Sequence, residues 1–242
     1  MLESPDMRPG KSKTAQLYLA SNSPRRRELL SLGGWEYVLL SAQVDETPLP
    51  GEAGEEYVQR LSKHKAYFTA SLAGIDGVII AADTTVLDHG MSKNTEILGK
   101  PSDQSEAGEM LRRLRGHTHQ VLTAISIMNT QDGTILSDLC TTFVPMRNYS
   151  EEEIAAYIAS GDPMDKAGAY AIQHTGFHPV ENLQGCFANV MGLPLCHLTR
   201  NLIKLGIPPK VDIPQACQAA LVYDCPVYHQ ILIEMTRDFA RS

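Results

Sequence analysis

The segment 17–32 constrains the fold most, because it predicts a strand, a tight loop and a helix in direct succession. Leu17–Ala20 is a short apolar run typical of a strand. Ser23 is a suitable helix N-cap, since its side-chain oxygen can accept a hydrogen bond from an early amide, and Pro24 suits the first helical position. The helix that begins there places the three guanidinium groups of Arg25–Arg27 at its N-terminus. Free amides, the positive end of the helix dipole and planar guanidinium groups favour a bound polyanion, most simply phosphate.

The rest of the chain alternates strand-like and helix-like segments. Val78–Ala82 is a continuous apolar run, as expected of a strand covered on both faces. Gln131–Gly133 lies between two strand-like segments and predicts a hairpin, which makes the sheet mixed. We therefore expect an α/β domain with a mixed sheet. Further strands are expected at 36–40, 120–128, 134–144 and as short strands after Gly168; helices are expected at about 53–72, 104–115, 150–161, 194–205 and from Tyr228 onward.

Changes in composition predict three regions. Residues 1–14 are expected to be a flexible N-terminal extension, and 15–207 to form the α/β domain. Pro208 and Pro209 mark a boundary, after which 208–242 is expected to be a helical extension that packs on the domain or on a partner; a packing role alone is favoured over a functional one. The first residues lack the hydrophobic segment of a secretory signal, and no run reaches membrane-spanning length, so no membrane association is expected.

Charge and cysteine content narrow the function. The chain has a net charge of −7, so a local group of arginines favours a small phosphorylated ligand over a nucleic acid polymer. The five cysteines have no metal-binding or redox spacing and are expected to be buried thiols in a reducing compartment, for which the cytoplasm is the expected location. The histidines lack a third ligand at a matching spacing, so no histidine metal site is expected.

Two charged residues lie in apolar surroundings. Asp83 stands at the predicted end of the strand 78–82, where α/β sheets gather ligands, and its carboxylate can bind a divalent metal or accept a proton from water. The alternative is that Asp83 caps the following turn. Lys65 falls within the apolar stripe of the helix 53–72, so it either extends to the surface or points at an anion. From spacing alone, the surface position is favoured.

Two further segments are candidates for ligand contact. Lys100 follows Gly99 in a loop that is not a Walker A loop, because the spaced glycines and the following Ser or Thr are missing. In Asp165–Gln173, small residues allow a ligand to approach the backbone, and Gln173 offers a donor and an acceptor suited to a base edge. Taken alone, Asp165–Gln173 is more typical of a tight, buried turn, and the alternative for Lys100 is an ordinary surface turn.

In their order along the chain, these segments resemble the Maf family of nucleoside triphosphate pyrophosphatases. Each motif is weak by itself, but the ordered set is specific and covers roughly 17–206. The matching pieces are Ser21–Arg26, Arg60–Leu61 with Lys65–Ala66, Ala82–Thr84, Gly99–Pro101, Asp165–Tyr170 with Ile172–Gln173, and Asn189 with Gly192–Pro194.

The resemblance implies an inosine-triphosphate-pyrophosphatase-like fold, with an elongated mixed β-sheet, flanking helices and a cleft between two lobes. It implies a hydrolase that cleaves a nucleoside triphosphate to the monophosphate and pyrophosphate with Mg²⁺ or Mn²⁺, in a homodimer with a house-cleaning role in nucleotide metabolism. Asp83 is the implied general base, and Glu46 and Asp83 are the implied metal ligands. The implied substrate-binding residues are Ser21, Ser23, Arg25, Arg26, Lys65, Thr84, Lys100, Asp165, Lys166 and Gln173, of which Arg25, Thr84 and Gln173 match positions linked to substrate choice.

The form of Asp165–Tyr170 resembles the branch of the family that acts on dTTP and UTP. We therefore expect thymine and uracil nucleotides, including modified pyrimidines, as substrates. Two alternatives stay open at this point. One is a pyrophosphatase acting on 7-methyl-GTP, and the other is a non-catalytic nucleotide-binding regulator of cell division, which would not need Asp83.

Overall fold

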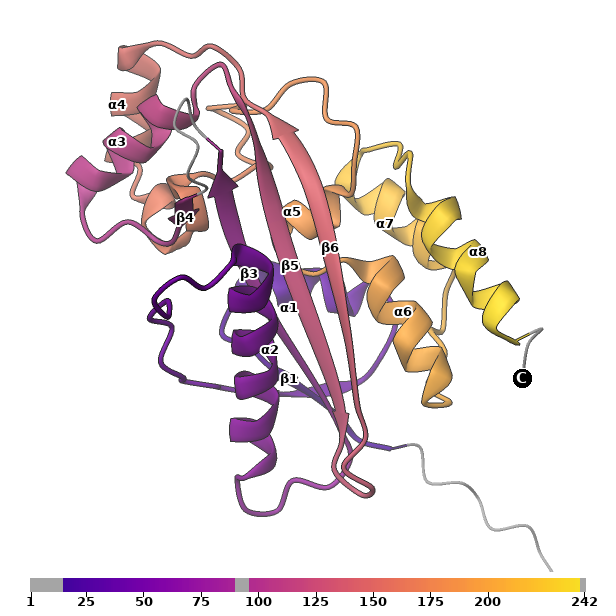
Figure 1. Ribbon diagram of the computed structural model, residues 1–242. Coiled ribbons are helices and arrows are strands. Elements are labelled where there is room, and N and C mark those ends of the chain that lie inside the picture. The colour runs from indigo at the N-terminus through magenta and orange to yellow at the C-terminus, as the bar shows by residue number, and fades with distance from the viewer. Residues whose placement is uncertain (1–14, 90–95, 240–242) are drawn as a thin grey trace, which may run out of the picture.

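The computed structural model describes residues 15–89 and 96–239, which form a mixed sheet flanked by helices (Figure 1). The strands lie in the order β2-β1-β3-β5-β6, with β4 also pairing with β3. They are β1 (Leu17–Ala20), β2 (Tyr37–Leu40), β3 (Val78–Asp88), β4 (Glu96–Leu98), β5 (Thr118–Asn129) and β6 (Ile135–Pro145). β1 is parallel to β2 and β3, whereas β4 and β5 are antiparallel to β3, and β5 and β6 form the predicted hairpin. The mixed α/β fold class is therefore confirmed.

The helices largely follow the predicted ranges, and additional short helices lie between them. The α-helices are α1 (Pro24–Ser31), α2 (Gly54–Ala70), α3 (Gln104–Leu114), α4 (Glu151–Ala159), α5 (Phe187–Met191), α6 (Leu195–Lys204), α7 (Ile213–Leu221) and α8 (Tyr228–Phe239), and the 3₁₀ helices are η1 (Asp162–Asp165) and η2 (Ala167–Ala169). The β5–β6 hairpin runs along the length of the molecule, with α2 beside it (Figure 1). No helix within residues 15–89 and 96–239 is both long and apolar enough to cross a bilayer.

The strand β3 is longer than predicted, and its edge is only partly paired. Asp83 was expected at the end of this strand but lies near its middle, because the β-branched residues that follow continue the pairing with β5. On the opposite edge, β1 pairs with β3 as far as Ala81, and β4 pairs from Val86 onward. Within the described residues, 82–85 therefore have no strand partner on this edge. Asp83 therefore lies beside an unpaired part of the sheet edge because the neighbouring strand β1 ends there, and not because β3 itself ends.

Alternation along β3 divides its side chains between two faces of the sheet. Ile79 and Ala81 pack with Ala66 of α2. Ile80 and Ala82 belong to a separate core that includes residues of α1, α5 and α6. By the same alternation, Asp83 lies on the α2 face and Thr84 on the α1 face of the sheet.

A second core lies at one end of the sheet, where α3 and α4 pack together (Figure 1). Its members include Leu111, Tyr149, Tyr157 and Phe177. The short strands predicted after Gly168 are wrong. This segment consists of η2, turns and a single bridge between Met146 and Val180, because Gly168 and Ala169 both have positive φ angles, which interrupt extended backbone.

The described part of the C-terminal extension packs on the domain, which is one of the two alternatives that the sequence left open. Ile213 of α7 is buried in the core beneath α1 and α6, and Leu221 and Tyr228 pack against it. The Nε1–H of Trp35 donates a hydrogen bond to the carbonyl of Pro208 at 3.2 Å. The predicted flexible extension 1–14 and the final residues 240–242 lie outside the described residues.

Candidate active site

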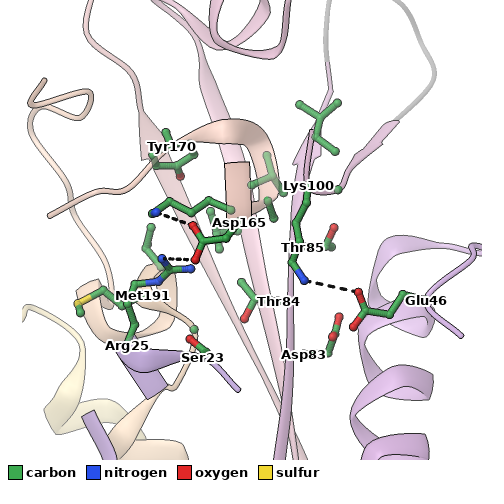
Figure 2. Close-up of a pocket in the computed structure, with 18 of the residues that line it drawn as sticks. Ser23, Arg25, Glu46, Asp83, Thr84, Thr85, Lys100, Asp165, Tyr170 and Met191 are labelled. Carbon is green, nitrogen blue, oxygen red and sulfur yellow. Dashed lines mark hydrogen bonds and ion pairs between the residues drawn. The ribbon is translucent and has the colours of Figure 1, made fainter. Parts of the chain in front are cut away.

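A cavity of about 860 Å³ lies between the two cores, in the position expected for a cleft between two lobes. Its walls come from the β1–α1 loop, α2, β3, β4, α3, the η1–η2 segment and α5 (Figure 2). All of the site residues predicted from the sequence line it. They are Ser21, Ser23, Arg25, Arg26, Glu46, Lys65, Asp83, Thr84, Lys100, Asp165, Lys166 and Gln173. Segments far apart in the sequence thus form a single site.

The β1–α1 loop has the predicted capped geometry. The Oγ of Ser23 accepts a hydrogen bond from the amide of Arg26 at 3.5 Å, and Pro24 occupies the first turn of α1. The Oγ of Ser21 accepts from the amide of Ser23 at 3.2 Å. These bonds fix the start of α1 and direct Arg26 towards the end of β1. Arg27 does not line the cavity.

Lys65 points inward and lies between two carboxylates. Its side chain is 9% exposed, and its Nζ lies 2.5 Å from Asp83 Oδ1 and 2.7 Å from Glu46 Oε1. The favoured surface position for Lys65 is therefore wrong, because the buried carboxylate of Asp83 offers it a partner inside the cavity. Lys100 is exposed and lies 3.8 Å from the other Glu46 oxygen, a contact visible in Figure 2.

Burial and charge act differently on the two carboxyl groups. Burial raises the pKa of Asp83 above its ordinary value, and the charges of Lys65 and Arg26 offset this only in part. Burial also opposes the ionisation of Glu46, but Lys65, Lys100 and Arg26 together hold its pKa below the ordinary value. Asp83 thus keeps a stronger affinity for a proton than an exposed aspartate has, which suits a group that must take one from water.

A chain of hydrogen bonds connects Arg26 to the interior. Its Nε and one terminal nitrogen donate to the carbonyl of Gly192 at 2.8 Å and to Thr84 Oγ1 at 3.0 Å. The hydroxyl of Thr123 donates to the carbonyl of Asn189 at 3.0 Å, so it accepts from Thr84 at 2.9 Å. Because a carbonyl oxygen can only accept, the donor and the acceptor of each of these hydrogen bonds are determined. Sequence patterns gave no signal for Thr123, which resembles any buried residue of a strand.

The opposite wall contains paired charges. Arg25 lies 3.8 Å from Asp165 (Figure 2). The ammonium of Lys166 donates to the backbone carbonyl and the carboxylate of Asp162 and to Asp165, so all three of its donors are used within the protein. Gln173 is exposed at the rim, and its amide has no hydrogen bond among the described residues.

The sequence gave the other lining residues no individual role, although Tyr170 and Ile172 lie in the segments that carry the family resemblance. Val86, Met110, Ile172 and Met191 give the cavity an apolar part, and Tyr170, buried beside them, donates to or accepts from His119 at 2.7 Å. Apolar residues on strands and helices have the same pattern whether they face a core or a ligand, so the sequence offered no distinction. Arg113 forms ion pairs with Asp88 and Glu96 at the rim of the cavity. The sequence did not predict these pairs, because single charged residues on separate elements show no pattern that connects them.

The oxygen donors in the cavity fit a hard divalent cation. Asp83 and Glu46 already share one cation, the Lys65 ammonium. Within the described part of the chain, no group of three or more His, Cys, Asp or Glu residues is arranged to hold a metal. Mg²⁺ is commonly held by one or two carboxylates together with water and substrate phosphates, so the donor set fits that ion and the similar Mn²⁺.

The chain is similar to a known protein family and to proteins with named activities. The family model described as Maf-like protein matches residues 16–205. A dTTP/UTP pyrophosphatase from Dehalococcoides mccartyi is 42% identical over 81% of this chain and 85% of its own length. Proteins of the same description from Methylococcus capsulatus and Pectobacterium atrosepticum are 46% and 47% identical, over 79% and 74% of this chain and 92% and 88% of their own lengths. A solved nucleoside-triphosphatase / dITP/XTP pyrophosphatase from Mycobacterium abscessus aligns with 78% of this chain and 98% of its own, with 13% identity and a TM-score of 0.37.

Proposed function

The chain belongs to the Maf family, and from this premise we propose that it is a pyrophosphatase that hydrolyses dTTP and UTP to the monophosphate and pyrophosphate. The observation that supports this most directly is the buried pair of Asp83 and Lys65 in a cavity that also contains Lys100, Arg25 and Arg26. A carboxylate able to take a proton thus lies among several cations able to bind a polyphosphate. The relatives named dTTP/UTP pyrophosphatase support the substrate class.

Asp83 acts as the general base in this proposal. Its Oδ1 accepts from Lys65, and its Oδ2 has no hydrogen bond from the described residues. Oδ2 is therefore available to orient a water molecule and to take its proton as the water oxygen bonds to phosphorus. The bond between that phosphorus and the oxygen bridging the α- and β-phosphates breaks, and the electron pair leaves with pyrophosphate.

The cations stabilise the phosphate charge as it shifts towards the leaving group. Three of the five N–H donors of Arg26 bind Gly192, Thr84 and Ser21, which leaves two for phosphate oxygens. Lys65 and Lys100 add two ammonium groups on the other side of the β3 edge. Mg²⁺ or Mn²⁺, held by Asp83 and Glu46, supplies further positive charge at the phosphate oxygens when bound.

The apolar part of the cavity is the proposed site of the base. Val86, Ile172 and Met191 offer contacts to a flat ring and to the methyl group of thymine. Gln173 has an amide that can both donate to and accept from the edge of a uracil or thymine base. Thr84, which donates to Thr123, can only accept a further hydrogen bond, and it orients Arg26.

A nucleotide panel tests this function. Purified protein is incubated with Mg²⁺ or Mn²⁺ and dTTP, UTP, CTP, GTP or 7-methyl-GTP, and pyrophosphate and orthophosphate are quantified separately. We expect equal amounts of monophosphate and pyrophosphate, with dTTP and UTP turned over fastest. A preference for 7-methyl-GTP would refute the assigned substrate class, and binding of nucleotides without turnover would support a regulator instead of an enzyme.

The oligomeric state, the cellular location and the role in nucleotide metabolism are proposed from the same family resemblance. The proposal includes a homodimer in the cytoplasm that removes unwanted nucleotides. Light scattering after size-exclusion chromatography tests the dimer, which should have about twice the 26.6 kDa mass of one chain. A single species of the monomer mass at micromolar concentration would contradict it.

A further inference from the structure

Lys65 occupies the space between the two carboxylates that are the proposed metal ligands. Its Nζ is within 2.7 Å of Glu46 and 2.5 Å of Asp83, so it contacts both oxygen donors at once. The side chains of Lys65 and Asp83 are 9% and 8% exposed, so water screens the contact between these two little, whereas Glu46 is 43% exposed. The ammonium therefore fills the role that a small cation would have at this position.

The charges around this contact oppose the binding of a metal ion alone. Arg26 acts on both carboxylates, and Lys100 acts on Glu46, so the cations near the pair outnumber the carboxylates. A divalent ion would add to this positive excess. A complex of the ion with a triphosphate carries net negative charge, and its binding would remove the excess instead.

The backbone of Lys65 is fixed, whereas its side chain can turn. Thr69 donates to the Lys65 carbonyl at 2.9 Å within α2, and α2 packs along β3 and β5. Phosphate oxygens in the same cavity would offer the ammonium alternative acceptors. The side chain can then leave the carboxylates without any movement of the helix.

We propose that Lys65 excludes divalent metal from Asp83 and Glu46 in the free protein, so that the metal enters only together with the triphosphate. This inference rests on the proposed function for the identity of the triphosphate ligand. It assigns Lys65 two successive partners: the two carboxylates before the substrate binds, and the phosphates afterwards. It also accounts for a proposed metal site that has two carboxylates, Asp83 and Glu46, since the phosphates supply the remaining ligands.

Electron paramagnetic resonance of Mn²⁺ tests the binding order without measuring turnover. The full-length protein is titrated with Mn²⁺ at a fixed pH near 8. We expect wild-type protein to bind Mn²⁺ weakly, and the affinity to rise on the order of tenfold or more when α,β-imido-dUTP, which resists cleavage between those phosphates, is present. Tight binding of Mn²⁺ alone to wild-type protein would overturn the proposal.

Two variants separate the role of Lys65 from general charge. Lys65→Met should strengthen binding of Mn²⁺ alone on the order of tenfold or more, whereas Lys100→Met removes an exposed lysine facing the same Glu46 and should change it by less than about threefold. No gain in Lys65→Met, with circular dichroism showing a folded protein, would overturn the inference. If Lys65→Met does not fold, the wild-type titration decides the question by itself.

The proposed function and this inference can fail separately. If no nucleotide is hydrolysed, inorganic triphosphate replaces α,β-imido-dUTP in the same titration. A rise in Mn²⁺ affinity that is larger in wild-type protein than in Lys65→Met would then support the exclusion by Lys65 although the enzymatic proposal had failed. Equal Mn²⁺ affinity with and without inorganic triphosphate would refute the exclusion, whatever the substrate.

Discussion

Replacement of Gly168 by alanine tests how closely the η1–η2 wall is held against β3. Gly168 has a φ of +68°, and a Cβ built there would lie 2.9 Å from a methyl carbon of Val86. Val86 is buried and paired on both sides, with Leu98 and Val121, so it cannot easily move away. The amide of Gly168 also donates to the carbonyl of Gly99, which ties the wall to the loop that contains Lys100.

The expected cost has two parts. A residue other than glycine in the left-handed region costs about 1–2 kcal/mol, and forcing an extra carbon into a packed site costs about 1–3 kcal/mol. Gly168→Ala should therefore lower the free energy of unfolding by about 2–5 kcal/mol. Gly161 supplies a matched control, because its φ is +76° but a built Cβ meets no described atom within 4 Å other than those of its own local backbone. Gly161→Ala should cost only the backbone part, about 1–2 kcal/mol.

Urea unfolding of both variants measures the difference. We expect Gly168→Ala to be the less stable variant, and to lose more activity than Gly161→Ala, because η2 lies between Lys166 and Tyr170 in the cavity wall. Adding Val86→Ala should remove most of the steric part, so the two substitutions should show favourable coupling in a double-mutant cycle. Equal stabilities of Gly168→Ala and Gly161→Ala would refute the close approach of η2 to β3.

Three further predictions concern the site itself. Because burial raises the pKa of Asp83 and a general base must be deprotonated, kcat/KM should fall as the pH drops through a value above the ~3.9 of a free aspartate; a rate that stays constant down to about pH 4 would contradict this. Thr123→Val removes the side-chain donor to the carbonyl of Asn189, which still accepts from the amide of Gly192, and removes the acceptor of the Thr84 hydroxyl; it should lower the free energy of unfolding in urea by about 0.5–1.5 kcal/mol, whereas Thr123→Ser should lose less, and equal losses would argue against the hydrogen-bond chain. Lys100→Met should change stability by less than about 1 kcal/mol, since the lysine is exposed, but should raise KM for the nucleotide, and an unchanged KM would remove Lys100 from the phosphate site.

Local sequence signals predicted the elements that position the site. The Ser23 cap and Pro24 define the start of α1. This prediction succeeded because a cap depends on residues a few positions apart. The hairpin of β5 and β6 was predictable for the same reason, from the turn residues between them.

Features that depend on distant residues could not be predicted locally. An apolar stripe on α2 does not show whether Lys65 turns to solvent or to Asp83, since the carboxylate comes from another element. β4 consists of three residues and exists through its pairing with β3. By contrast, the start of α7 does have a local signal, since Asp212 is a helix N-cap that accepts from the amide of Gln215. The family resemblance brought together residues that no local pattern connects.

The central claim is that Asp83 activates water for cleavage of a nucleoside triphosphate. The most direct measurement is the rate of pyrophosphate release from dTTP by wild-type protein, Asp83→Asn and a control, Glu55→Gln, which removes an exposed carboxylate of α2 outside the cavity. We predict a loss on the order of a hundredfold or more in Asp83→Asn and wild-type activity in Glu55→Gln, with both variants folded. Undiminished pyrophosphate release by Asp83→Asn would contradict the account.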